Sequence, residues 1–240
     1  MKYLLTATFF LLLIGGKPKV IIVSLPCDDH YIKGVDDELV FDLDNAKKEF
    51  DTSIIQNPKN ALTYYHQSTI ATLKGNNTDA LRYSDSAISI DPDFAFAYEH
   101  RASIYARLCE YKNAVMDMNK LIELKPDFFI AYYARATYLS NLNDTKACIA
   151  DLTKCIELNP NYKNAYAARA RRNAQLKNYQ LALNDMTIAV KLRTDEAPIY
   201  TAKGYYEYKL GQKDKAYADF NTAKEMGDPD ADWYIKNYYK

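Results

Sequence analysis

The side chains that could bind a metal or act as nucleophiles are few and scattered. The sequence has three histidines and four cysteines, namely His30, His66, His100, Cys27, Cys109, Cys148 and Cys155. None forms a C-x-x-C pair or a Cys/His cluster with zinc spacing. Cys148 and Cys155 would lie about 10 Å apart along a helix, too far for a disulfide. We therefore expect no metal site and no cofactor.

His66 and His100 are the two histidines whose spacing places them at equivalent positions, 34 residues apart. On adjacent helices their backbones would be separated by about 8–10 Å. Zinc requires nitrogen atoms at about 2 Å and usually four ligands. This pair therefore does not indicate a metal site.

Acidic and basic side chains recur in a pattern that could be mistaken for acid/base dyads. Each of four basic residues is followed sixteen positions later by an aspartate: Arg101 and Asp117, Arg135 and Asp151, Arg169 and Asp185, Lys203 and Asp219. Four copies of one dyad have no catalytic purpose, whereas one structural ion pair per repeat explains them. No G-x-S-x-G, G-x-x-x-x-G-K or H-E-x-x-H motif is present. We predict that the protein is not an enzyme.

Composition places the chain among ordinary folded proteins. Its 240 residues are 48% hydrophobic and 26% charged, which is typical of a globular chain and not of a disordered one. With 31 basic and 31 acidic residues the formal net charge is zero. A general nucleic-acid binder would carry a basic excess, so we expect no nucleic-acid partner.

The N-terminal 26 residues differ from the rest. Met1-Lys2 precedes an uncharged apolar run over 3–14, and Gly15-Gly16 and Lys17-Pro18-Lys19 separate it from a second apolar run over 20–25. A charged start followed by an apolar run is typical of a secretory signal. We predict that residues 1–26 are a signal peptide or an N-terminal membrane anchor, in preference to a cytoplasmic core element. The chain would then be exported, to a periplasmic or other extracytoplasmic location.

Cys27 follows this segment directly, a layout that resembles a bacterial lipoprotein signal. That resemblance implies acylation of Cys27 and a membrane-tethered lipoprotein. Ser24 and Pro26 depart from the lipobox, which has Leu three residues before the cysteine and a small residue next to it. Cleavage, retention and lipidation of the segment all remain open.

A period of 34 residues organises the chain from about residue 44. Tyrosine recurs at Tyr64, Tyr98, Tyr132, Tyr166, Tyr200 and Tyr234. Small residues recur at Ala46, Ala80, Ala114, Cys148, Ala182 and Ala216, and in a second register at Ser68, Ala102, Ala136, Ala170 and Gly204. Proline recurs at Pro58, Pro92, Pro126 and Pro160. Each period contains two apolar-periodic stretches of helical length, separated by polar turns.

This pattern resembles the tetratricopeptide repeat (TPR) family, whose repeats show an aromatic residue, small residues and a closing proline at this spacing. The fold class implied is all-α: a TPR α-solenoid, which is a right-handed superhelix of antiparallel helix pairs. We predict a linker over 27–43 and a TPR domain over 44–240. The domain would comprise a half repeat at 44–60, repeats at 61–94, 95–128, 129–162, 163–196 and 197–230, and a capping helix at 231–240.

The resemblance also implies a binding surface, because the first helices of TPR hairpins line a concave face that receives a peptide. The residues at the corresponding positions are Tyr65, His66, Thr69, Phe96, Glu99, His100, Ser103, Tyr133, Thr137, Arg171 and Tyr205. One TPR subgroup clamps acidic C-terminal peptides with Lys, Asn and Arg. The corresponding residues here are Tyr65, Thr69, His100, Ile130 and Ala134, so that clamp is absent.

The function predicted is a non-enzymatic scaffold or adaptor that binds a protein or peptide partner in its concave groove. The alternative is an accessory subunit that docks a catalytic or transport complex. A stable stoichiometric complex in the native host would favour the accessory subunit. The sequence does not identify the partner.

Overall fold

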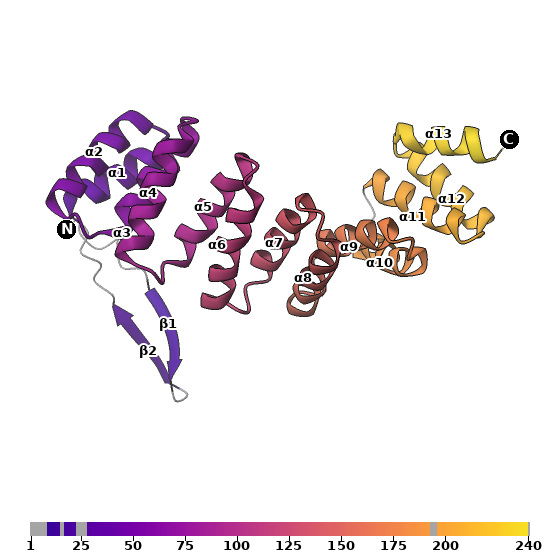
Figure 1. Cartoon of the computed structure of the whole chain (residues 1–240), viewed down its shortest axis with the longest axis horizontal. Helices are drawn as coiled ribbons and strands as arrows, with labels where there is room; N and C mark the ends of the chain where they lie inside the picture. The colour runs from indigo at the N-terminus through magenta and orange to yellow at the C-terminus, as the bar shows by residue number, and fades with distance from the viewer. Residues whose placement is uncertain (1–8, 15–16, 23–27, 193–195, 240) are drawn as a thin grey trace. The chain divides into compact units, whose positions relative to one another are not determined.

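The computed structural model describes residues 9–14, 17–22, 28–192 and 196–239, and thirteen helices lie within these ranges (Figure 1). They are α1 (Asp29–Leu39), α2 (Leu43–Gln56), α3 (Ala61–Leu73), α4 (Asn77–Ile90), α5 (Ala95–Arg107), α6 (Tyr111–Leu124), α7 (Phe129–Asn141), α8 (Thr145–Leu158), α9 (Lys163–Gln175), α10 (Tyr179–Leu192), α11 (Ala197–Lys209), α12 (Lys213–Glu225) and α13 (Pro229–Tyr238). The predicted all-α class of antiparallel helix pairs is confirmed.

Two short strands precede the helices. β1 (Phe9–Ile14) and β2 (Lys17–Ile22) form an antiparallel hairpin in which Phe9 is opposite Ile22. Residues 1–8, 15–16 and 23–27 lie outside the described ranges, so the proposed cleavage and lipidation at Cys27 remain predictions. No described helix combines the length and the apolar character needed to cross a bilayer.

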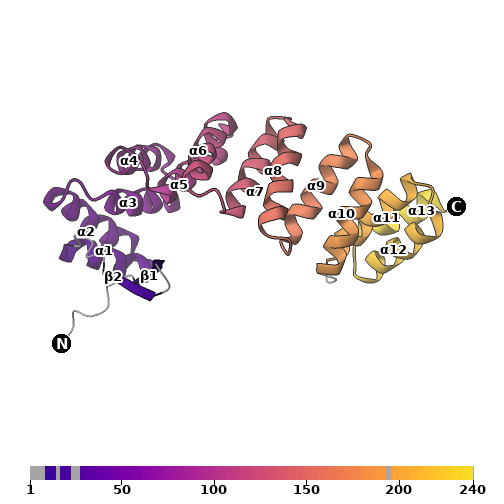
Figure 2. The same cartoon turned by 90° about the horizontal axis from the view of Figure 1, so that it is seen from below.

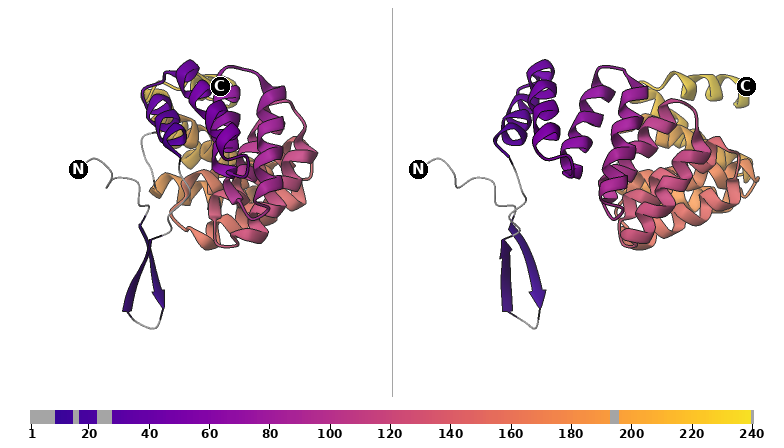
Figure 3. Two further views of the ribbon diagram at one scale, coloured as in Figure 1. Left: turned by 90° about the vertical axis from the view of Figure 1, so that its left-hand side faces the viewer. Right: turned by 60° about the vertical axis from the view of Figure 1, so that its left-hand side comes forward.

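The chain divides into two compact units, residues 1–97 and 98–240, with the boundary inside α5. In unit 1, α1 pairs with α2 and α3 with α4 (the indigo helices of Figure 3 include the first pair). In unit 2, α7 pairs with α8, α9 with α10 and α11 with α12, and α13 covers the last pair (Figure 2). We describe each unit by itself.

The predicted linker over 27–43 is wrong, because residues 29–39 form helix α1. Asp28 caps this helix by accepting the Tyr31 backbone N–H at 2.7 Å. Gly34 is buried on the helix, and Tyr31 and Val35 pack against the cluster formed by Ala46, Phe50 and Ile70. Residues 28–56 therefore form a complete hairpin where the sequence predicted only its second helix.

The same tight turn joins the two helices of every hairpin. One residue in the left-handed region ends each first helix, with φ between 60° and 77°: Phe41, Gly75, Cys109, Asn143, Lys177 and Gly211. The next residue donates its backbone N–H to the carbonyl five positions back, as Asn76 does to Ala71 at 2.9 Å. This is the Schellman arrangement, and it leaves one residue between the left-handed position and the second helix. Glycine fits such a position without strain, whereas Phe41 and Lys177 do not.

Inside each hairpin, two facing positions sixteen residues apart compensate each other in size. Gly34 faces Phe50, and Gly204 faces Phe220; a methyl group on either glycine would approach the facing ring to between 2.6 and 3.0 Å. In the intervening repeats the corresponding pairs are Ala102 and Met118, Ala136 and Leu152, and Ala170 and Met186, all fully or almost fully buried. The smallest pair is Ser68 and Ser84, whose hydroxyls hydrogen-bond at 2.8 Å. The two helices of each hairpin pack closely at these positions, which explains why small residues recur there along the sequence.

The predicted ion pairs are present and structural. Nε and Nη2 of Arg135 donate to the two carboxylate oxygens of Asp151 at 2.7 and 2.6 Å. Nη1 of the same guanidinium donates to Asn119 on the preceding hairpin at 2.8 Å. Arg169 makes the same fork with Asp185, and Arg101 is bidentate to Asp117. One arginine thus joins helices of two hairpins, which fixes how they stack.

The recurring tyrosines lie next to these arginine–aspartate ion pairs. Tyr98, Tyr132 and Tyr166 are buried in unit 2. The guanidinium three residues later in each repeat lies 5.7 to 5.9 Å from the ring centroid. The Tyr132 hydroxyl donates to the Pro126 carbonyl at 3.0 Å, at the turn before its own helix. The tyrosine register therefore belongs to the hairpin core and not to an exposed site.

Candidate peptide-binding surface

In unit 2, the first helices α7, α9 and α11 present one continuous set of cavity-lining residues, which we call the first-helix face. A small cavity of about 130 Å³ is lined by Tyr133 and Thr137 of α7 and by Arg171 of α9. A larger one of about 590 Å³ is lined by Arg171 and by Tyr205 of α11. Four of the predicted residues therefore lie on this face, and Arg171 belongs to both cavities.

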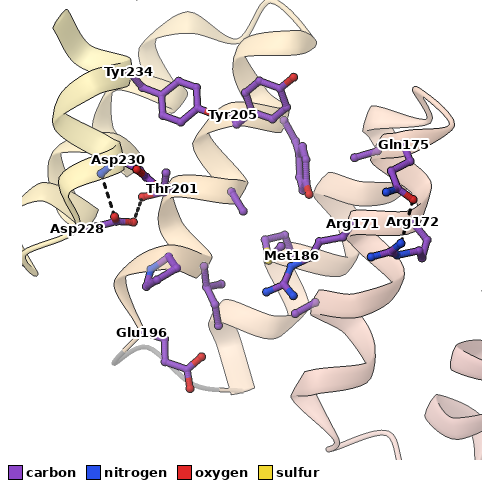
Figure 4. Close-up of a pocket in the computed structure, with 16 residues that line it drawn as sticks. Arg171, Arg172, Gln175, Met186, Glu196, Thr201, Tyr205, Asp228, Asp230 and Tyr234 are labelled. Carbon is purple, nitrogen blue, oxygen red and sulfur yellow. Dashed lines mark hydrogen bonds between the residues drawn. The ribbon is translucent and has the colours of Figure 1, made fainter. Parts of the chain in front are cut away.

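Arg171 is an exposed basic residue that lines the larger cavity. Its side chain extends from α9 into the cavity, while Tyr205 and Tyr234 border the opposite side (Figure 4). Arg171 is exposed, and no described residue forms an ion pair with it. The neighbouring Arg172 donates to Gln175 at 3.2 Å. An exposed guanidinium without an ion pair can bind a carboxylate or phosphate by two parallel hydrogen bonds.

The aromatic side chains next to Arg171 are held in place by other rings. Tyr205 lies 5.7 Å from Tyr234 of the capping helix, centroid to centroid, and Tyr133 packs edge-on against Tyr162 at 5.1 Å. Burial raises the pKa of the Tyr133 hydroxyl, and the positive charge of Arg171 opposes that shift only in part. Tyr133 therefore stays protonated at neutral pH and can donate a hydrogen bond.

Two of the three acidic side chains that line the larger cavity are engaged with other residues. Asp228 accepts the Thr201 hydroxyl at 2.6 Å and caps α13 through the Asp230 backbone N–H at 3.1 Å. Glu196 pairs with Lys163. The charged groups left for a ligand are the basic side chains of α9 and the exposed carboxylate of Asp230 on α13. Sequence reasoning identified Arg171 but missed Arg172, Tyr206 and Tyr234. Tyr234 belongs to the tyrosine register, which is otherwise part of the hairpin core.

The predicted residues of α5 do not line either of these cavities. The Ser103 hydroxyl donates to the His100 carbonyl at 2.6 Å. Burial raises the pKa of Glu99, and its charge in turn contributes to raising the pKa of Tyr138 on α7. Glu99, His100 and Ser103 are half-buried between neighbouring helices, and their assignment to a binding site remains a prediction.

Unit 1 has a separate groove of about 470 Å³, which we call the α1–α3 groove. Tyr65, His66, Thr69 and Leu73 of α3 form one wall. The other wall consists of Val35, Glu38, Leu39 and Phe41, from α1 and the turn that follows it. Three predicted residues thus face a wall that the sequence assigned to a linker. Phe96, also predicted, is half exposed and lies outside this groove. Its ring centroid is 6.4 Å from that of Phe94.

His66 is occupied by contacts within unit 1. Its Nδ1 lies 2.6 Å from a Glu38 carboxylate oxygen and its Nε2 lies 3.3 Å from the Tyr31 hydroxyl. The imidazole also stacks on Phe50, with ring centroids 5.2 Å apart. The side chain therefore holds α1 and α3 together. Its edge contributes to the groove wall, and both of its ring nitrogens are already engaged.

No metal-binding or nucleophilic cluster accompanies these surfaces. Among the described residues, no three His, Cys, Asp or Glu side chains are arranged to hold a metal ion. Cys148 and Cys155 are buried, and burial raises the pKa of the Cys155 thiol to about 11. A thiol with that pKa is protonated and unreactive at neutral pH.

Comparison with known proteins agrees with this architecture. A family model described as tetratricopeptide repeat matches residues 97–128 and 130–162. No curated protein matches the sequence. The chain therefore contains TPR repeats in the part where the 34-residue pattern is most regular.

Several solved structures share the fold. YrrB, a TPR protein with an unusual peptide-binding site, is 21% identical, with a TM-score of 0.68 over 78% of this chain and 97% of that one. A TPR protein from Parabacteroides merdae ATCC 43184 is 23% identical, with a TM-score of 0.68 over 84% and 80%. MamA is 18% identical, with a TM-score of 0.66 over 75% and 96%. At these identities the likeness establishes the fold alone.

Proposed function

We propose that this chain, whose fold is that of TPR proteins, is a non-enzymatic scaffold that binds a protein segment on the first-helix face of unit 2. The observation that carries the proposal is Arg171, an exposed cation that pairs with no described acidic residue and lies at the junction of two cavities with aromatic walls. The bound segment would place an acidic group against Arg171 and apolar side chains against Tyr133 and Tyr205. Rigid aromatic side chains supply large contact area at little entropic cost.

The absence of a catalytic role is part of the proposal. The titratable pairs that recur along the chain are engaged in joining the two helices of a hairpin, as Arg135 and Asp151 are. YrrB, which shares the fold, is a protein with a peptide-binding site. Both observations support binding as the activity of this surface. If the protein is instead an accessory subunit, it would use the same face to dock its complex.

Binding is expected to depend on the first-helix face and not on the second helices. Peptides can be selected from a random library displayed on phage against the full chain, and their affinity can be measured by fluorescence anisotropy. Tyr133→Ala combined with Arg171→Ala should weaken binding more than about tenfold, or 1.4 kcal/mol. The loss would come from an apolar anchor and a charge partner removed together.

Control substitutions lie on the second helices. Lys120 and Lys154, on α6 and α8, pair with Glu123 and Glu157 of their own helices. Lys120→Ala and Lys154→Ala should leave the affinity unchanged. If they abolished binding while the Tyr133 and Arg171 variants did not, the site would lie on the second helices and the proposal would be wrong.

We also propose that residues 1–26 export the chain or anchor it in a membrane, as their charged start and apolar runs suggest. Fractionation of the native host should place the protein outside the cytoplasm or in the membrane. Its intact mass should then distinguish a cleaved from a retained segment, and loss of an acyl mass in Cys27→Ser would establish lipidation. A full-length chain in the soluble cytoplasmic fraction would contradict this proposal.

A further inference from the structure

Helix α13 of unit 2 carries the only tryptophan of the sequence on its exposed side. Trp233 is 54% exposed. At the corresponding position of α3, α5, α7, α9 and α11 the residue is buried, and these residues are Thr63, Ala97, Ala131, Ala165 and Ile199. Helix α13 therefore presents a large exposed indole where the preceding first helices have a buried side chain.

The indole is one end of a connected row of aromatic rings, which we call the aromatic patch. It consists of Trp233, Tyr238, Tyr208, Tyr239 and Tyr217, in that order. The distances between successive ring centroids are 5.9, 4.3, 6.2 and 5.0 Å. Tyr217 is 43% exposed, and the other three tyrosines are partly exposed. Contiguous exposed apolar surface is typical of an interaction site, whereas single exposed apolar residues are not.

Tyr238 makes the patch unsuitable for the second helix of a hairpin. It falls at the small-residue position where the two helices of the other hairpins pack closely. The residues at that position are Gly34, Ser68, Ala102, Ala136, Ala170 and Gly204. The Tyr238 ring stacks on Tyr208 with an angle of 10° between the ring planes. A second helix packed here as in the other hairpins would overlap the ring, so the patch fits a different occupant.

The charges beside Trp233 make this surface complementary to itself. Asp230, Trp233 and Lys236 are all exposed and form one row of residues spaced by three on α13. Asp230 has no ion pair with a described residue, and Lys236 pairs with Asp232 while 70% of its side chain stays exposed. A two-fold axis at Trp233 that reverses the row brings Asp230 of each copy opposite Lys236 of the other. A partner surface of uniform charge would oppose one of these two groups.

We propose that the aromatic patch binds a second copy of this chain, with the two α13 helices antiparallel. Trp233 and Tyr238 of the two copies would pack at the centre, and two Asp230–Lys236 pairs would flank them. Antiparallel helices also bring opposite ends of their dipoles together. Because one helix of each copy makes most of the contact, the interface is small and we expect a dissociation constant of about 10–100 µM. The dimer does not depend on the proposed binding of a peptide.

Self-association of the full chain tests the proposal, without added peptide because Asp230 also lines the larger cavity. Sedimentation velocity from about 5 to 500 µM should show a monomer–dimer equilibrium. Since Trp233 is the single tryptophan, its fluorescence reports the contact directly. The emission should shift to shorter wavelength as the dimer forms and buries the indole. Trp233→Ala should weaken self-association at least about tenfold.

Charge reversal tests the self-complementary arrangement. Asp230→Lys would place lysine opposite lysine, and Lys236→Glu would place acid opposite acid. Each variant alone should therefore dimerise at least about tenfold more weakly than the unmodified chain. An equimolar mixture of the two variants places opposite charges at both contacts. The mixture should form a heterodimer whose affinity is within about threefold of the original.

Leu181→Ala is the matched control for loss of exposed apolar surface. Leu181 is 53% exposed on α10 and lies outside the aromatic patch. This variant should leave self-association unchanged. Thermal midpoints of all these variants should stay close to that of the unmodified chain, because the side chains replaced are exposed.

A chain that stays monomeric over the whole concentration range would overturn the proposal. So would a dimer that Trp233→Ala leaves intact, a dimer whose tryptophan emission does not shift, or a mixture of charge variants without a heterodimer. Emission that shifts only when phosphatidylglycerol vesicles are added to a monomeric chain would assign the patch to a membrane surface instead.

Discussion

Asp151→Ala is expected to lower the free energy of unfolding by about 3 kcal/mol, the scale found when one partner of a buried ion pair is removed. The carboxylate accepts two hydrogen bonds from Arg135 and is almost fully buried, with 9% of the side chain exposed. Without it the guanidinium keeps only Asn119 as a partner while remaining largely buried. Because Arg135 joins two hairpins, the loss also weakens their stacking.

Chemical denaturation followed by circular dichroism measures this change. Asp127 is exposed in the turn before α7, and no described residue forms a hydrogen bond or ion pair with its carboxylate, so Asp127→Ala provides a matched removal of one carboxylate. Its free energy of unfolding should stay within about 0.5 kcal/mol of that of the unmodified chain. Equal midpoints for the two variants would show that the Arg135–Asp151 pair contributes nothing to stability.

Gly34→Ala is expected to destabilise the chain by about 1–3 kcal/mol, although alanine favours helices over glycine. The added methyl group would lie 2.6 Å from the ring of Phe50. That ring cannot move freely, because it stacks on His66 and contacts Tyr31 at 6.0 Å between centroids. The clash should therefore outweigh the gain in helix propensity.

The double variant Gly34→Ala with Phe50→Leu tests the cause. It transfers to the first hairpin the size combination that Ala136 and Leu152 form in unit 2. Part of the lost stability should return, measured as a rise in thermal midpoint over Gly34→Ala alone. A double variant less stable than either single variant would contradict size compensation between these two positions.

Much of the fold follows from the 34-residue pattern, because each repeat carries the same helix and turn signals. Helix α1 escaped prediction since its hairpin lacks two of those signals. Its sequence has His30 where the tyrosine register falls and Ser24 where the proline register falls. Gly34, one period before Ser68, is the residue that could have revealed it.

The ion pairs were predictable from their spacing, but the further hydrogen bonds that their arginines make to the preceding hairpin were not. The bond from Arg135 to Asn119 joins residues that also differ by sixteen positions, in the opposite direction and across hairpins. Within the candidate sites, His66 shows why a repeat position alone does not define a binding residue. Its partner Glu38 lies in the helix that the sequence did not predict.

The central claim is that the first-helix face of unit 2 holds the partner, and site-specific photocrosslinking in the native host tests it most directly. Thr137 is exposed on α7 and lines the cavity it shares with Arg171, while Lys154 is exposed on α8. A photoreactive benzoylphenylalanine is placed at one or the other position of the full chain. We expect Thr137 to yield a defined crosslinked protein and Lys154 to yield none. Adducts from Lys154 with none from Thr137 would contradict the assignment.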